Sequence, residues 1–424
     1  SLLREDALAG SESPMTAALL AYFSEHPRYA ALAKDMAREA GGRIRPARVA
    51  PALAEALYGT RMTMSPSRLE LYNACPFRHF AEAGLRAQPR QEAGERPAEL
   101  GAFYHAALEA FLRRCMEENV SYRALTDERI DLMLDELLPT VIALHNDGVL
   151  LENERLRMTL FLLVETVRQS ARAIVRQLAA GRFAPAALEL RFGNGAAFPP
   201  IRLDLGNGRT ALLTGVVDRL DRAELPDGTE ALRVIDYKSG GKKLDFGAVL
   251  DGLCLQLPLY LAAVTAAGGV PGGMYYMPVR VALPDSGADA AAELQKRFRL
   301  AGLTLEDPAV LECTEEAMQG ASAVLAGVRK KQDGSCSGAV CGGTELLHLM
   351  REAKRIAERT GSAMLSGNVA VSPISGACEY CDYRSVCRFD AKLPSCRTRK
   401  KRRLDREAFF DTIGRKGGDG DAMD

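Results

Sequence analysis

Three features are scarce in this 424-residue sequence: long apolar runs, an excess of charge of one sign, and cysteine. No run of about 18 or more apolar residues occurs, and the first residues do not join a cationic segment to an apolar one. Lys+Arg and Asp+Glu are equal at 55 each, so the overall charge indicates no anionic partner. We expect a cytoplasmic protein in which any surface for such a partner is local.

Ten cysteines in so long a chain are too few for a disulfide scaffold, so a tight cluster is better interpreted as a metal site. The composition, 47% hydrophobic and 26% charged, is that of a folded globular protein. The chain also lacks a G-x-x-x-x-G-K-[ST] loop, so no ATPase activity is expected within these residues.

The spacing of apolar residues divides the chain into helical and extended parts. Residues 1 to about 60 have a helical pattern, and a second helix is predicted to begin at Ser65-Pro66, with Ser65 as its N-cap. From Gly101 to about 180 the pattern is again helical. It places His105 and Glu109 one turn apart on the same helix face.

The pattern then changes to strands with the segments LELRF, IRLDL, TALLTGVVDRLD and ALRVIDYK, for which we predict an antiparallel meander. A helix from about Phe246 to Ala267, a strand Gly273 to Val279 and a mainly helical region 285–365 follow. This order of elements predicts an α/β fold with a mixed sheet flanked by helices.

Two adjacent predicted strands carry acidic residues and a lysine. In a strand, residues two apart point to the same face, so Asp236 and Lys238 project together, and Asp218 of the preceding strand can approach them. Carboxylate oxygens hold Mg²⁺, which polarises a phosphate and activates water, while a lysine positions the nucleophile. The bare D-x-K pattern is also common in weak surface ion pairs.

The ordered segments G-A-F-Y-H, G-V-V-D-R-L-D, V-I-D-Y-K-S-G and Q-L-P-L-Y together resemble the RecB-like branch of the PD-(D/E)xK nuclease superfamily. The resemblance implies a restriction-endonuclease-like core with large helical insertions, and metal-dependent hydrolysis of DNA. It implies that Mg²⁺ is bound by His105, Asp218 and Asp236. The catalytic residues would be Asp218, Asp236, Lys238, Gln256 and Tyr260.

Three other acidic residues lie near these motifs in the sequence. The resemblance gives Glu189 a position near the site. Glu109 is expected to be structural, and Asp221 is expected to pair with a nearby arginine.

The segment C-E-Y-C-D-Y-R-S-V-C places Cys378, Cys381 and Cys387 in a C-x2-C-x5-C array, and three thiolates need a fourth ligand. Cys75, in C-P-F-R-H-F, resembles the lone upstream cysteine of RecB-like nucleases that hold a [4Fe-4S] cluster. A structural Zn²⁺ is the alternative, with His79 as a possible ligand. In either case we expect a structural clasp between segments far apart in the sequence.

The clasp and the nuclease motifs together resemble the C-terminal part of the B subunits of AddAB helicase–nucleases. That family implies 5′ to 3′ exonuclease action on single-stranded DNA in double-strand break repair by homologous recombination, as a heterodimer with an AddA-type subunit. The implied domains are 1–60, a remnant of a helicase-like domain; 61–395, the nuclease with its Fe–S clasp; and 396–424, a basic, partly disordered tail. Alternatives are a stand-alone RecB-like exonuclease of CRISPR adaptation and an inactive, cluster-stapled DNA-binding module.

Overall fold

The structure is a computed structural model that describes residues 2–11, 13–40, 48–59, 62–88, 97–145, 154–279, 295–393 and 396–418. Within these ranges the main sheet has six strands in the order β11-β8-β7-β6-β5-β2. The pairs β6–β7 and β8–β11 are parallel and the other neighbours are antiparallel, so the predicted mixed sheet is confirmed. The strands are β2 (Ala184–Phe192), β5 (Gly215–Glu224), β6 (Glu230–Lys238), β7 (Val270–Pro278), β8 (Ala301–Leu305) and β11 (Val340–Cys341).

A smaller sheet lies beside the main one, with strand order β1-β4-β3. The N–H of Thr214, between β4 and β5, donates to the carbonyl of Met64 at 2.8 Å, so this sheet continues directly into β5. The predicted meander is therefore only partly right, because the β3–β4 hairpin leaves the main sheet to pair with β1. The strands are β1 (Met62–Met64), β3 (Ile201–Asp204) and β4 (Thr210–Leu213).

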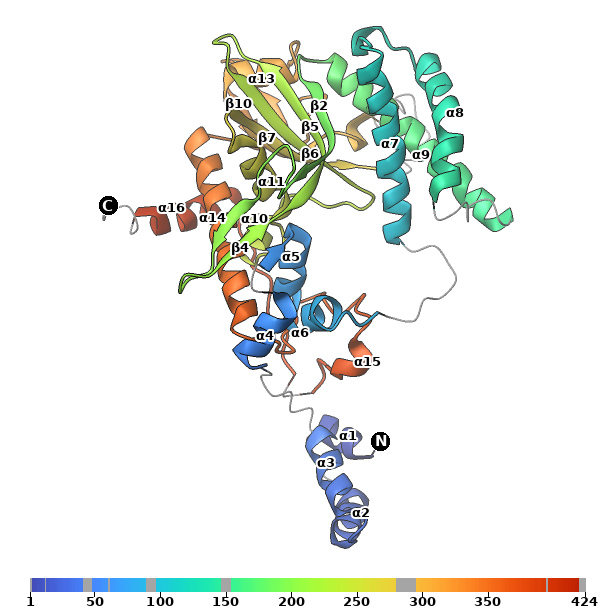
Figure 1. The fold of residues 1–424 in the computed structure, drawn as a ribbon, viewed down its shortest axis with the longest axis vertical. Coiled ribbons are helices and arrows are strands. Elements are labelled where there is room, and N and C mark those ends of the chain that lie inside the picture. The colour runs from blue at the N-terminus through green and yellow to red at the C-terminus, as the bar shows by residue number, and fades with distance from the viewer. Residues whose placement is uncertain are drawn as a thin grey trace.

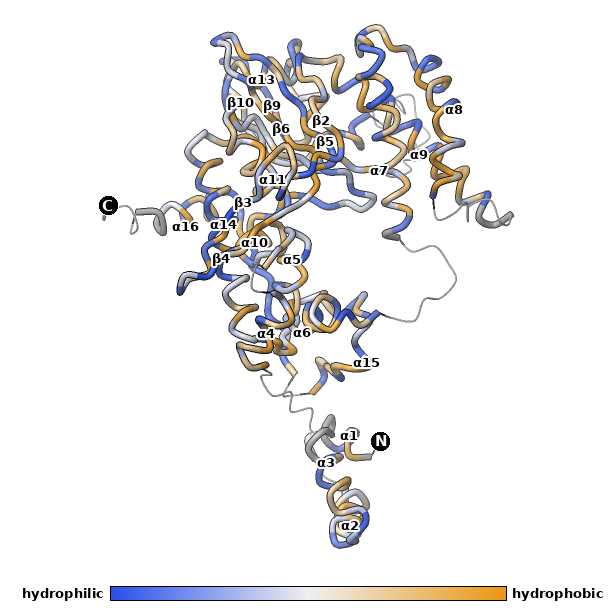
Figure 2. Tube along the Cα trace, in the orientation of Figure 1, coloured by the Kyte–Doolittle hydropathy of each residue, from blue (hydrophilic) through white to orange (hydrophobic). Residues whose placement is uncertain are grey.

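Three long helices form a layer on one side of the main sheet (Figure 1). They are α7 (Pro97–Glu117), α8 (Asp127–Leu144) and α9 (Glu154–Ala179), with the short 3₁₀ turn η2 (Tyr122–Ala124) between α7 and α8. Apolar residues three and four apart give α8 one buried face, and hydrophilic and hydrophobic turns alternate along it (Figure 2). This layer and one face of the sheet share a core that includes Tyr237 and Tyr275.

A second layer packs on the other face around the long helix α14 (Gly343–Leu365). In this layer α4, α5 and α6 lead along the chain to the cysteine region, and α16, near the C-terminus, packs against α14 (Figure 1). The other elements of this part are α4 (Pro51–Tyr58), α5 (Pro66–Ala74), α6 (Pro76–His79), the π-helix η1 (Phe80–Gly84), α10 (Phe246–Leu250), α11 (Gln256–Thr265), α15 (Arg384–Cys387) and α16 (Arg406–Gly418).

The first three helices pack against one another and lie apart from the two layers, at the far end of the molecule in Figure 1. They are α1 (Leu2–Ala9), α2 (Pro14–Glu25) and α3 (Ala30–Ala40), so the predicted helical character of this part is confirmed. Among the described helices, none is both long and apolar enough to cross a membrane.

The helix predicted from Phe246 to Ala267 is two helices, α10 and α11. Gly252 lies between them with φ of 72°, a left-handed conformation that interrupts a helix. Its carbonyl accepts a hydrogen bond from Asn73 Nδ2 at 3.2 Å, which anchors the break to α5.

Two further expectations from the sequence differ from the structure. Region 285–365 holds β8 and β11, the helix α13 (Pro308–Thr314) and a two-stranded ribbon of β9 (Val328–Lys330) and β10 (Cys336–Gly338), as well as α14. Residues 285–294 of that region lie outside the described residues. In the segment expected to be a tail, α16 places Phe409 and Ile413 in the core, because its apolar residues recur at helical spacing.

Candidate active site

Three neighbouring strands place carboxylates side by side. The register between β2 and β5 puts Glu189 opposite Asp218, and the register between β5 and β6 puts Asp236 at the next position beside Asp218. Glu189 has φ of 44°, a region that residues with a Cβ seldom occupy. Such local strain tends to occur at functional sites, where the surrounding fold maintains it.

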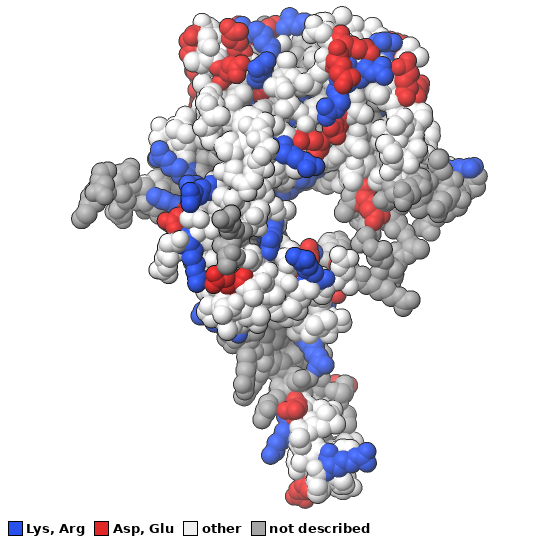
Figure 3. All heavy atoms as spheres, viewed as in Figure 1, with Lys and Arg blue, Asp and Glu red and all other residues white. Residues whose placement is uncertain are grey.

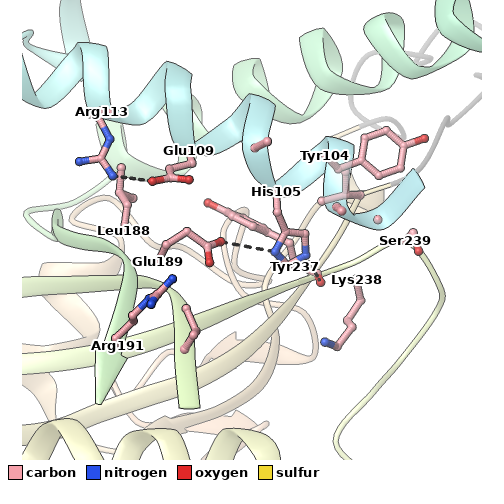
Figure 4. A pocket seen from close by; sticks show the side chains of 15 residues that line it. Tyr104, His105, Glu109, Arg113, Leu188, Glu189, Arg191, Tyr237, Lys238 and Ser239 are labelled. Carbon is pink, nitrogen blue, oxygen red and sulfur yellow. Dashed lines mark hydrogen bonds and ion pairs between the residues drawn. The ribbon is translucent and has the colours of Figure 1, made fainter. Parts of the chain in front are cut away.

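His105 reaches this cluster from α7. Its Nδ1 lies 3.6 Å from Glu189 Oε1 and 3.5 Å from Asp218 Oδ1, and its Nε2 lies 3.2 Å from the carbonyl oxygen of Tyr237. Figure 4 shows the imidazole and the Glu189 side chain pointing toward each other between α7 and the sheet. The ligand atoms of His105, Glu189 and Asp218 all lie within 4.8 Å of one another.

The two buried aspartates are held in different ways. Asp218 Oδ2 accepts a hydrogen bond of 2.6 Å from the N–H of Tyr237. Asp236 pairs with Lys238, which confirms that these two side chains project together. Within the described residues neither oxygen of Asp236 accepts a well-aligned hydrogen bond, although the side chain is 1% exposed.

The pKa values of Asp218, Asp236 and His105 are all shifted, because these groups are buried close to one another. Burial raises the pKa of Asp218 well above its ordinary value, and the nearby Asp236 carboxylate adds to the rise. Burial also raises the pKa of Asp236, against the opposing effect of Lys238. For His105, burial lowers the pKa, but Glu189 and Asp218 outweigh it and leave the pKa raised. The site thus holds more negative charge than its surroundings favour, and a bound cation would relieve it.

A cavity of about 860 Å³ opens next to His105, with Glu189 and Lys238 among its lining residues. Glu109 also lines it and pairs with Arg113 at 2.5 Å, and its structural role stays a prediction. Arg191 lies at another edge of the cavity (Figure 4). Acidic and basic side chains are intermixed over this face of the molecule, so neither sign dominates it (Figure 3).

Gln256 and Tyr260 lie on α11, one turn apart. Gln256 Nε2 donates to the hydroxyl of Tyr260 at 3.1 Å, and the Tyr260 ring packs edge-on against Phe192. Burial raises the pKa of the Tyr260 hydroxyl, which therefore stays protonated. The structure thus joins these two residues to each other, and their catalytic role stays a prediction.

Asp221 lies on the opposite side of β5 from Asp218 and takes no part in the carboxylate cluster. Its two oxygens lie 2.9 Å from the Nε atoms of Arg219 and Arg233. All three side chains are buried. The prediction that Asp221 pairs with an arginine is confirmed, with two arginines where one was expected.

The four cysteines of the predicted clasp come together. Cys75 is buried at the junction of α5 and α6, and the thiols of Cys378, Cys381 and Cys387 lie close enough to interact electrostatically with it or with one another. Burial raises the pKa of Cys378, and Cys75 is the next contributor.

Backbone contacts hold the two cysteine-bearing segments together. The N–H of Phe77 donates to the carbonyl of Ala370 at 3.1 Å, and the N–H of Ile374 donates to the carbonyl of Ala74 at 2.9 Å. His79 is less suited to be a ligand, because its Nε2 accepts a hydrogen bond from Arg68 Nε at 3.2 Å.

Sequence reasoning missed two charged residues beside the site. Glu70 of α5 accepts hydrogen bonds from the N–H groups of Leu255 and Gln256, at 2.8 and 3.1 Å, and its other oxygen lies 3.3 Å from Lys242 Nζ. The only sequence signal was the position of Lys242, four residues after Lys238 in the same glycine-containing segment. Glu70 gave no signal, because its partners lie more than 170 positions away.

Comparison with protein-family models adds an independent observation. The model of the PD-(D/E)XK nuclease superfamily matches residues 63–388. The chain belongs to this superfamily. The match covers the carboxylate cluster, Lys238, α11 and all four clasp cysteines, and it confirms the family and the fold predicted from the motifs.

Curated relatives of this PD-(D/E)XK protein share one name, that of the B subunit of an ATP-dependent helicase/deoxyribonuclease. The protein from Symbiobacterium thermophilum is 35% identical over 87% of this chain and 33% of its own length. The protein from Moorella thermoacetica is 36% identical over 81% of this chain and 31% of its own length. The Bacillus subtilis protein is 31% identical over 80% of this chain and 30% of its own length. The chain thus spans about a third of the length of the curated relatives it matches.

Proposed function

We propose that this chain is a metal-dependent deoxyribonuclease domain that hydrolyses phosphodiester bonds of DNA. The observation that carries the proposal is the convergence of His105, Glu189, Asp218 and Asp236 beside Lys238, at the edge of a cavity. Family membership supports the same chemistry.

The donor set suits a divalent cation such as Mg²⁺. Carboxylate oxygens are its preferred protein ligands, and the buried Asp236 carboxylate has unused hydrogen-bonding capacity. His105, Asp218 and Asp236 would hold the ion, with Glu189 close enough to join them. When bound, the ion would supply a polarised phosphate and a more acidic water.

The protein's own groups would supply the remaining functions. Lys238 would orient the attacking water and stabilise the negative charge that develops on the phosphate. The Tyr237 backbone holds both Asp218, through its N–H, and His105, through its carbonyl, so a single residue fixes two ligands. Gln256 and Tyr260 would contact the DNA strand near the site.

We further propose that the domain works within the B subunit of a helicase–nuclease that repairs double-strand breaks by homologous recombination. The names of the relatives support the part of this proposal that concerns a subunit of a helicase–nuclease. An AddA-type helicase–nuclease subunit would be the partner. The domain would act as a 5′ to 3′ exonuclease on single strands. It would work in the cytoplasm, where chromosomal DNA is accessible.

We also propose a [4Fe-4S] cluster at the cysteine clasp. Four thiols from distant segments form the donor set that such a cluster requires. A single structural Zn²⁺ is the alternative occupant of the same four thiols.

The proposed activity is tested with single-stranded DNA labelled at either its 5′ or its 3′ end. The chain should degrade it with Mg²⁺ and not with EDTA, and Lys238→Ala should lower kcat at least about a hundredfold. Lys331→Ala, at an exposed turn, is the matched control. Equal cleavage by Lys238→Ala, or cleavage without divalent metal, would overturn the assignment. The order in which labelled fragments form gives the polarity.

A further inference from the structure

Lys242 follows the strand that carries Asp236 and Lys238, in the segment between β6 and α10. Its ammonium lies 3.3 Å from Glu70 Oε2 and 5.2 Å from the centre of the Tyr276 ring. Lys238 Nζ lies 5.8 Å from the centre of the same ring. Two ammonium groups therefore converge on one buried aromatic side chain next to the candidate metal site.

Lys242 contacts two side chains, Tyr276 and Glu70, that the surrounding fold holds in place. Tyr276 pairs with Asp236 in the parallel register of β6 and β7, and it is fully buried. Glu70 is held by two backbone N–H groups at the start of α11. The Lys242 side chain is 32% exposed, so part of it reaches solvent.

The charges around Lys242 distinguish it from an ordinary surface ion pair. The Glu70 carboxylate is shared with the positive end of α11, so it neutralises Lys242 only in part. An ammonium has three donors, and the geometry assigns one of them to Glu70. Lys242 and Asp236 also interact electrostatically, which places this cation beside the acidic cluster.

A site that brings a polyanion to several carboxylates needs cations close to them, because the phosphate backbone is otherwise repelled. We propose that Lys242 is a second phosphate-binding cation of this site, which contacts the DNA backbone next to the scissile bond, and that Glu70 is the positioning residue that holds it there. The inference rests on the proposed function for the identity of the ligand.

The first test measures binding of a fluorescent oligothymidine to the 424-residue chain in Ca²⁺, at several KCl concentrations. Lys242→Gln should weaken binding about fivefold to tenfold and reduce the slope of log affinity against log salt by about 0.7, the loss of one phosphate contact on a single strand. The adjacent, exposed Lys243→Gln carries the same charge change and should stay within about twofold of the original chain. Equal effects of the two variants would overturn the inference.

The second test asks whether Glu70 acts through Lys242. Glu70→Gln keeps an acceptor for the α11 N–H groups and removes the ion pair, so it should weaken binding about threefold. In a Lys242→Gln background the same change should have no further effect. An equal loss in both backgrounds would overturn the positioning role. Lys242→Arg should restore most of the binding, and thermal unfolding of each variant verifies its folding.

Cleavage kinetics separate this inference from the proposed function. In Mg²⁺, Lys242→Gln should raise KM with kcat nearly unchanged, whereas Lys238→Ala should lower kcat. A chain that binds DNA through Lys242 and does not cut it would contradict the proposed function alone. A chain that cuts DNA and whose Lys242→Gln variant has normal KM and salt dependence would contradict the inference alone.

Discussion

Asp221 and Arg233 face each other across β5 and β6, with Asp221 Oδ2 2.9 Å from Arg233 Nε and both side chains buried. Arg219 binds the other oxygen of Asp221, and its guanidinium also donates to the Tyr237 hydroxyl at 3.3 Å. The main chain of Tyr237 holds Asp218 and His105. This buried ion cluster therefore supports the residue that organises the candidate site.

Asp221→Asn should destabilise the fold by roughly 3–5 kcal/mol, because it leaves two buried guanidinium groups without a counter-charge. Urea unfolding followed by circular dichroism measures the change. The exposed pair Arg222 and Glu230 on the same two strands provides the control. Glu230→Gln should cost less than about 1 kcal/mol. If the two variants lose similar amounts of unfolding free energy, burial is not the reason that Asp221 matters.

Asp218→Asn should make the metal-free protein more stable at pH 8, by on the order of 2 kcal/mol, although it abolishes cleavage. The substitution removes one of two adjacent buried carboxylates and keeps an acceptor for the Tyr237 N–H. Thermal unfolding with EDTA and then with Mg²⁺ or Mn²⁺ tests this. The original chain should gain stability from the metal, and the variant should not. Asp227→Asn, at an exposed turn, should behave like the original chain.

His79 should make the protein less stable in mild acid. Burial lowers its pKa from the ordinary 6.5 to about 3, and the charge of Arg68 contributes. Between these values the unfolded chain binds a proton that the folded chain does not. Stability therefore falls as pH drops below 6.5, by up to about 1.4 kcal/mol per pH unit. Urea unfolding from pH 7.5 to 4.5 should show a shallower loss for His79→Gln. Parallel curves would contradict the assignment.

Cys378→Ser should remove iron and acid-labile sulfide from the purified protein and lower its thermal stability, since the clasp joins distant segments. Metal analysis and the visible absorption spectrum measure the loss. Cys336→Ala, in β10, should keep the full iron content, because this cysteine lies in a separate ribbon. If the unmutated protein is colourless and contains zinc but no iron, the clasp holds Zn²⁺ and the cluster proposal is wrong.

Local signals in the sequence predicted much of this fold. Ser65 and Pro66 mark the start of α5, where the Ser65 hydroxyl accepts from the N–H of Arg68. The two-residue period of strands placed Asp236 and Lys238 on the same face. In both cases the decisive interaction lies within a few residues of the signal, so one segment contains the information.

The features that the sequence did not reveal depend on distant partners. The β3–β4 hairpin leaves the main sheet because β1, more than a hundred residues earlier, offers it an edge. Cys336 and Cys341 lie in a segment rich in glycine and serine, yet they are buried in β10 and β11. Propensity within a window does not determine such long-range pairings.

The hydrogen bond from the Tyr72 hydroxyl to the carbonyl of Asn368 joins residues 296 positions apart. A ribosome releases α5 long before Thr360 and Asn368, so the main sheet can begin to pair while this helix still lacks these two late contacts. Completion of the site then waits for the last part of the chain to be translated. A nascent chain stalled before Thr360 would display the catalytic strands while α5 lacks its contacts with Thr360 and Asn368.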